Sequence, residues 1–82
     1  MLEIYSEKYS SADRQFEIVG FRDKEKVRIK VYEITERKRV VISKFEATAV
    51  IDVVHDANIS RTNLFQQFIK SAKQFLKVYA SS

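Results

Sequence analysis

The sequence predicts an α+β fold, in which an antiparallel sheet is followed by one long C-terminal amphipathic helix packed on one face. The sheet has four strands, or five if the last one bends into two. Apolar residues recur at every second position from Leu2 to Val54, which is typical of strands with one buried face. From Leu64 to Tyr79 the period changes to that of a helix. With 82 residues we expect a single domain over 1–82, with its strand region at 1–56 and its helix region at 60–80.

The strands are separated by clusters of polar residues, because the chain has no proline and Gly20 is its only glycine. These clusters place turns at Ser10–Asp13, Arg22–Glu25, Glu36–Arg39 and His55–Ser60. Each of the first three strands then has one apolar face. The residues that we assign to these core faces are Leu2 and Ile4, then Phe16 and Ile18, then Val27, Ile29 and Val31.

The fourth strand is predicted to run from Arg39 to Val54. Its core face would carry Val41, Phe45, Ala47, Ala49, Ile51 and Val53, with Ser43 as the one polar residue among them. Because this run exceeds the usual strand length, we expect a bend or bulge near Ala47–Ala49, where the side chains are small. A helix over Glu46–Val54 is the alternative, and the β-branched residues in this segment disfavour it.

The C-terminal segment has a wide apolar face and a basic flank. Eight residues from Leu64 to Tyr79 fall within an arc of about 140° on a helical wheel. Lys70, Lys73 and Lys77 form a stripe beside that arc. Ser60 or Thr62 would cap the start of the helix. The wide arc on so short a chain also predicts a homodimer, in which a second copy covers part of the apolar surface.

Composition excludes several classes of site. No cysteine is present, so disulfides, thiolate metal sites and thiol catalysis are excluded, and we expect neither a metal nor a cofactor. No apolar run approaches the roughly 20 residues that cross a bilayer, and Glu3 and Glu7 stand where a signal peptide would have basic and apolar residues. A basic amphipathic helix can lie on a membrane surface, but these aromatic residues are needed to cover the sheet. We therefore expect a cytoplasmic protein without a membrane partner.

Catalysis has weak support in the sequence. His55 has Asp52, Asp56 and Ser60 nearby in the sequence. A hydrolytic site is therefore conceivable, in which His55 acts as general base and a carboxylate orients it. No glycine-rich turn accompanies these residues to supply oxyanion donors, and their spacing matches no metal motif. The sequence therefore predicts a protein that is not an enzyme.

The charge distribution indicates nucleic acid as a partner. The chain carries a net charge of +4, and its excess of cations rises from the N-terminal third to the helix. On the sheet face opposite the helix, Arg28, Lys30 and Tyr32 would lie beside Glu3, Tyr5, Glu7 and Tyr9, if the strand registers agree. The residues predicted to bind nucleic acid, preferably single-stranded DNA or RNA, are Arg28, Lys30, Tyr32, Arg37, Lys38, Arg39, Lys70, Lys73 and Lys77.

Each of these groups also has a purely structural explanation. Lysines near a helix C-terminus interact favourably with the helix dipole, and charges at a hairpin tip protect the sheet edge from unwanted pairing. Arg28 and Lys30 could form cross-strand ion pairs with Glu3 or Glu7. The alternative function is a protein–protein interaction or inhibitor module that docks a partner chain by its sheet edge or its helix.

Overall fold

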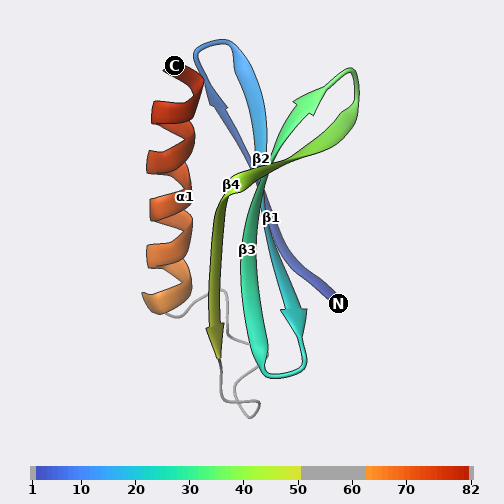
Figure 1. The fold of residues 1–82 in the computed structure, drawn as a ribbon, viewed down its shortest axis with the longest axis vertical. Helices are drawn as coiled ribbons and strands as arrows, with labels where there is room; N and C mark the ends of the chain where they lie inside the picture. Colours follow the sequence, from blue (N-terminus) through green and yellow to red (C-terminus); the bar gives the residue numbers. More distant parts are fainter. Residues whose placement is uncertain (1, 51–62, 82) are drawn as a thin grey trace.

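The computed structural model describes residues 2–50 and 63–81. Four strands, β1 (Leu2–Ser11), β2 (Arg14–Asp23), β3 (Lys26–Thr35) and β4 (Lys38–Val50), form one antiparallel sheet in the order of the chain. The helix α1 (Asn63–Ser81) lies across one face of this sheet (Figure 1). The predicted fold class is confirmed. His55 and its neighbours, the turn at His55–Ser60 and the helix caps Ser60 and Thr62 lie outside the described residues.

Tight two-residue turns join the four strands, at three of the predicted positions. In the β1–β2 and β3–β4 turns both central residues have positive φ, at Ala12, Asp13, Glu36 and Arg37. This is the type I′ geometry, which matches the twist of the flanking strands. In the β2–β3 turn only Lys24 has positive φ, as in a type II′ turn. Glycine or asparagine usually occupies such positions, so the sequence located these turns but did not indicate their type.

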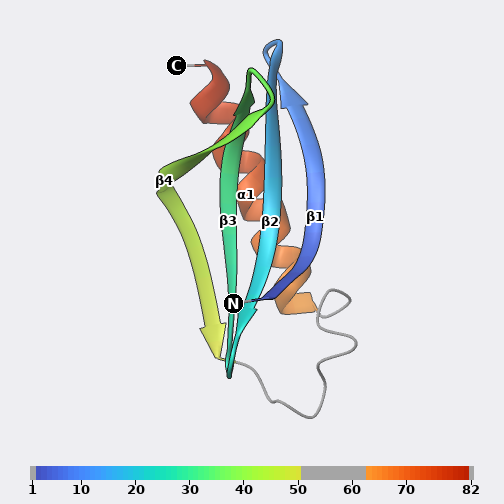
Figure 2. The same cartoon turned by 90° about the vertical axis from the view of Figure 1, so that its right-hand side faces the viewer.

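The hydrophobic core lies between the sheet and α1. Its largest buried side chains include Phe16, Ile18 and Ile29 from the sheet and Leu76 from the helix. The helix contributes Phe65, Ile69, Ala72, Leu76 and Ala80 to this layer. Leu64, which the helical wheel places in the apolar arc, is 47% exposed, because it lies at the edge of that arc. The other face of the sheet carries no helix of the described residues (Figure 2).

A bulge in β1 overturns part of the predicted face assignment. Glu3 pairs with Phe21 and Tyr5 pairs with Gly20, so β1 has one extra residue between these two pairs. One extra residue moves every later side chain to the opposite face. Tyr5 and Tyr9 therefore pack against the core and Glu7 bonds to the helix, rather than lying beside Arg28. Glu3, before the bulge, stays on the face opposite α1.

A larger irregularity bends β4. Lys30 pairs with Glu46 and Tyr32 pairs with Val41, so four residues of β4, 42–45, stand opposite Val31 alone. The strand bends sharply in Figure 2. The bend lies before the predicted position at Ala47–Ala49. Because it adds an odd number of residues, the side chains that precede it lie on the opposite face from the one predicted. Ile42 is buried in the core, whereas Val41 is 53% exposed, so the assignment of Val41 to the core is wrong.

Candidate nucleic-acid interface

A row of cations runs along β3 on the face opposite α1. Val27, Ile29 and Val31 point into the core, so the alternate residues Lys26, Arg28 and Lys30 point away from it. Alternate residues on a strand stand about 6.6 Å apart, and the row therefore spans about 13 Å. We call Lys26, Arg28 and Lys30 the β3 row. Among the described residues, no carboxylate lies within ion-pair distance of any of them.

Two aromatic rings lie beside the β3 row, both toward its Lys30 end. Phe21 of β2 pairs with Arg28, and the Nζ atom of Lys30 lies 5.9 Å from the centre of the Phe21 ring. Tyr32 continues β3 beyond Lys30 on the same face, and the guanidinium of Arg39 lies 5.6 Å from its ring centre. Burial raises the pKa of the Tyr32 hydroxyl. Cations beside rings on an open sheet face suit a polyanion whose bases can stack.

Arg28 has a hydrogen-bond donor that lacks an acceptor among the described residues. Its side chain is half-buried, and its Nε atom is buried without a hydrogen-bond partner. A buried donor left unpaired typically costs about 1 to 3 kcal/mol. Such a donor in a folded protein calls for an explanation, and a ligand that accepts its hydrogen bond is one.

Arg39 is engaged inside the molecule. Its Nε donates to Glu17 at 2.6 Å and its Nη1 donates to Glu3 at 3.1 Å, so it bridges β4 to β2 and β1. Glu17 also accepts from the hydroxyl of Ser6 at 2.5 Å. The Arg39 guanidinium, and then the Ser6 hydroxyl, hold the pKa of the Glu17 carboxyl below its ordinary value. Arg39 thus neutralises a carboxylate that is buried on the face without a helix.

The other two tip cations have no such role. Arg37 and Lys38 are exposed at the β3–β4 turn, and within the described part of the chain neither forms an ion pair. Nine residues of extended chain, about 30 Å, separate Arg28 from Arg37. The tip and the β3 row therefore lie far apart on the molecule.

The helix lysines lie on the other layer, beside β1. The Nζ atom of Lys73 lies 2.5 Å from Glu7, whose carboxylate also accepts a hydrogen bond from the hydroxyl of Tyr5. The bond to Lys73, and then the bond to Tyr5, lower the pKa of Glu7. Burial and the bond to Glu7 raise the pKa of Tyr5 to about 12. Lys73 therefore anchors α1 to β1, while Lys70 and Lys77 stay exposed.

The predicted cations thus do not all meet on one surface. Arg39 shares the face without the helix with the β3 row, Arg37 and Lys38 lie at the exposed β3–β4 turn, and the lysine stripe flanks α1. Lys26 and Phe21 were not among the predicted residues. The signal that could have found them is the two-residue turn at Lys24–Glu25, which sets Phe21 opposite Arg28.

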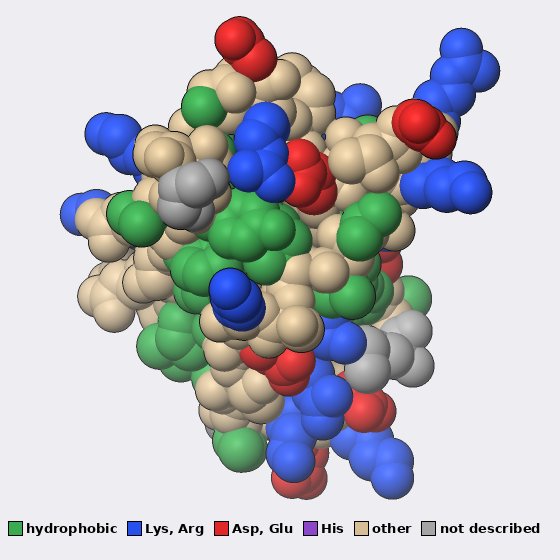
Figure 3. All heavy atoms as spheres, turned by 45° about the horizontal axis from the view of Figure 1, so that its top comes forward, with side chains coloured by type: hydrophobic (Ala, Val, Ile, Leu, Met, Phe, Trp, Pro, Cys, Tyr) green, Lys and Arg blue, Asp and Glu red, His purple; other side chains and the backbone are tan. Residues whose placement is uncertain are grey.

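A second surface is apolar. One flank of α1 carries Leu64 and Val78, which are 47% and 71% exposed, together with the half-buried Phe68 and Phe75. The Phe75 ring stacks on Tyr79 and lies tilted against Phe45 of β4, with ring centres 5.7 and 5.3 Å away. We call Leu64, Phe68, Phe75 and Val78 the apolar flank. In Figure 3, hydrophobic side chains gather between α1 and the β3–β4 hairpin, with charged side chains at their rim.

A bidentate ion pair lies near the end of α1. Arg14 donates from Nε and Nη2 to both carboxylate oxygens of Glu33, at 2.8 and 2.6 Å. The same guanidinium lies 5.0 Å from the ring centre of Tyr79 and 5.6 Å from that of Phe16. Arg14 is therefore a structural residue that joins β2, β3 and α1.

Comparison with protein-family models, with curated proteins and with solved structures finds no match to this chain. Among the described residues, no helix is long and apolar enough to span a membrane. In the same residues, no cluster of three or more His, Cys, Asp or Glu side chains could hold a metal ion.

Proposed function

We propose that the protein binds single-stranded nucleic acid across the sheet face opposite α1. The β3 row would contact phosphates, and Phe21 and Tyr32 would offer rings to unpaired bases. The observation that carries this proposal is the unpaired state of the row. Arg14, Arg39 and Lys73 are each held by a carboxylate, whereas Lys26, Arg28 and Lys30 have no carboxylate partner among residues 2–50 and 63–81. A duplex fits the proposal less well, because its bases are already stacked.

The test is a titration of fluorescently labelled single-stranded DNA and RNA, and of duplex DNA, at several salt concentrations. The double variant Arg28→Gln with Lys30→Gln should weaken binding to different sequences alike, because phosphate contacts carry no base identity. For single strands, the slope of log affinity against log salt should become shallower by about 0.7 for each lost contact, hence by about 1.4.

A matched control removes the same charge from the other layer. The variant Lys70→Gln with Lys77→Gln has the same net charge as the first variant, yet its positions lie on α1. We expect its salt slope to stay close to that of the wild type. If this control loses as much slope as the β3 variant, the polyanion follows the helix, and the sheet-face proposal is wrong.

The second candidate function is docking of a protein partner. It is favoured by the apolar flank of α1, where Leu64 and Val78 are exposed and none of the four residues is charged. A partner helix could cover this surface. Absence of nucleic-acid binding at low salt, together with a stoichiometric polypeptide that co-purifies and is lost on Val78→Lys, would favour this function over the first.

A further inference from the structure

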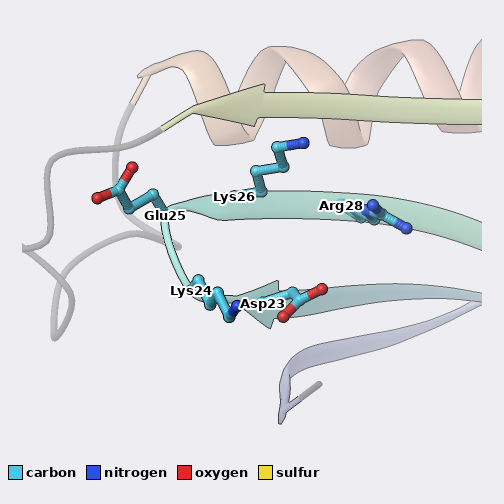
Figure 4. Close-up of a pocket in the computed structure, with 5 residues that line it drawn as sticks. All are labelled: Asp23, Lys24, Glu25, Lys26 and Arg28. Atoms are coloured by element: carbon cyan, nitrogen blue, oxygen red, sulfur yellow. The ribbon is translucent and has the colours of Figure 1, made fainter.

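A polar pocket lies at the end of the β3 row, where the β2–β3 turn closes the sheet. Its volume is about 470 Å³, and it is lined by Asp23, Lys24, Glu25, Lys26 and Arg28 (Figure 4). The turn is held by the side chain of Arg22, whose Nε donates to the carbonyl of Lys24 at 3.1 Å. The pocket is thus continuous with the proposed interface and ends at a fixed turn.

The side chains of the pocket carry an excess of positive charge. In Figure 4, Arg28 points along the sheet away from the turn, Lys26 leans toward β4, and Glu25 points outward. Three of the five lining residues are cationic. Arg28 is also the residue whose buried Nε has no partner. With its guanidinium rotated toward the pocket, Arg28 would present Nε and a terminal nitrogen together to a ligand, which is the geometry that binds two phosphate oxygens.

We infer that this pocket takes the terminal phosphate of a single strand, an inference that rests on the proposed function. Glu25 points outward at the turn, whereas Asp23 extends along the sheet toward Arg28, so a backbone that continued past the turn would bring further phosphates against the Glu25 carboxylate. A strand that ends there avoids that repulsion. A terminal phosphate monoester also carries more negative charge than a phosphate within the chain, about −1.5 to −2 at neutral pH.

The experiment compares three oligonucleotides of one sequence: one with a 5′ phosphate, one with a 3′ phosphate and one with neither. The wild-type protein should bind one of the phosphorylated strands about tenfold more tightly than the unmodified strand, as expected for a charge-assisted bidentate contact. This ratio should fall to about one in Arg28→Gln. In Asp23→Asn the ratio should rise, because a competing carboxylate is removed, and a damaged fold would not produce such a gain.

The outcomes separate this inference from the proposed function. Equal binding of all three strands by the wild type would overturn the terminal-phosphate site and leave binding across the sheet face intact. A preference that persists in Arg28→Gln would also overturn it, by placing the phosphate elsewhere. Failure of every strand to bind at low salt would overturn the proposed function and this inference with it.

Discussion

The ring of Phe65 lies directly on Gly20. A Cβ atom built on Gly20 would stand 3.1 Å from Cζ and 3.2 Å from Cε2 of that ring, and 3.2 Å from the Cβ of Tyr5. The rings of Tyr5 and Phe65 meet edge to face, with centres 5.1 Å apart. The chain's only glycine therefore leaves the space that the ring of Phe65 occupies.

Gly20→Ala should destabilise the protein. Its φ is not positive, so alanine would normally favour folding by restricting the unfolded chain. Here the steric conflict with the packed ring of Phe65 outweighs that gain, so the free energy of unfolding should fall. Overpacking of this kind typically costs about 1 to 3 kcal/mol. Chemical denaturation measures the change. In a double-mutant cycle, Phe65→Leu should relieve part of the loss, and strict additivity would show that the two residues do not interact.

Lys24→Gly should stabilise the protein by about 0.5 to 1 kcal/mol, since a left-handed backbone is unfavourable for lysine and not for glycine. Lys24 has φ 56°. The matched control is Glu25→Gly in the same exposed turn. Glu25 does not have positive φ, so glycine there should destabilise by a similar amount. Thermal unfolding measures the stability of both variants. Equal shifts of their melting temperatures in the same direction would contradict the turn geometry.

The hairpin tip divides into two functions that can be separated by mutation. Arg39→Gln should cost about 1 to 2 kcal/mol, because it leaves the buried carboxylate of Glu17 without its main donor. Arg37→Gln with Lys38→Gln should change the free energy of unfolding by less than about 0.5 kcal/mol. If this double variant also leaves the salt dependence of nucleic-acid binding unchanged, the exposed tip is only a solvated end of the hairpin.

Acid should weaken the fold through the paired carboxylates. The pKa values of Glu7, Glu17 and Glu33 are all lowered, in each case chiefly by a bond to a cation. Below their ordinary pKa of 4.5 the unfolded chain binds more protons than the folded one, so stability falls as the pH falls through the lowered pKa values. Urea denaturation between pH 7 and pH 3 measures this fall.

Glu17→Gln should flatten that pH dependence, because it removes one of the groups responsible. Glu36→Gln provides the control, since Glu36 lies at an exposed turn and no ion pair of the described residues includes it. An unchanged acid profile in Glu17→Gln would mean that other carboxylates account for the effect.

A homodimer remains our prediction, and the apolar flank is the surface through which we expect it. The flank carries no charge, so two copies can face each other without repulsion. Light scattering should give about twice the mass of the chain at micromolar concentration. Leu64→Lys with Val78→Lys should give the monomer, while Lys70→Gln with Lys77→Gln should stay dimeric. A wild-type monomer whose unfolding is independent of concentration would contradict this prediction.

The local pattern of the sequence was sufficient for the elements and their order. Alternation and helical period arise within a few residues, so the strands, the three turns and α1 could be located from Leu2 to Val50 and from Leu64 onward. The same alternation placed Arg28 and Lys30 opposite the core, because β3 has regular alternation throughout its length. Where a strand has no bulge, the face on which one side chain lies determines the face of the next.

Tertiary structure decided which cations are available and which faces the edge strands present. A bulge inserts residues that the alternation of apolar and polar side chains does not reveal. Tyr5, Glu7 and Val41 therefore lie on the opposite face from the one predicted. The partners of Arg39 and Lys73 are 22 or more residues away in the chain and meet them only in the folded sheet and helix. The fit of Phe65 on Gly20 is of the same kind, because it depends on the distance between two layers, and no local property of the sequence encodes that distance.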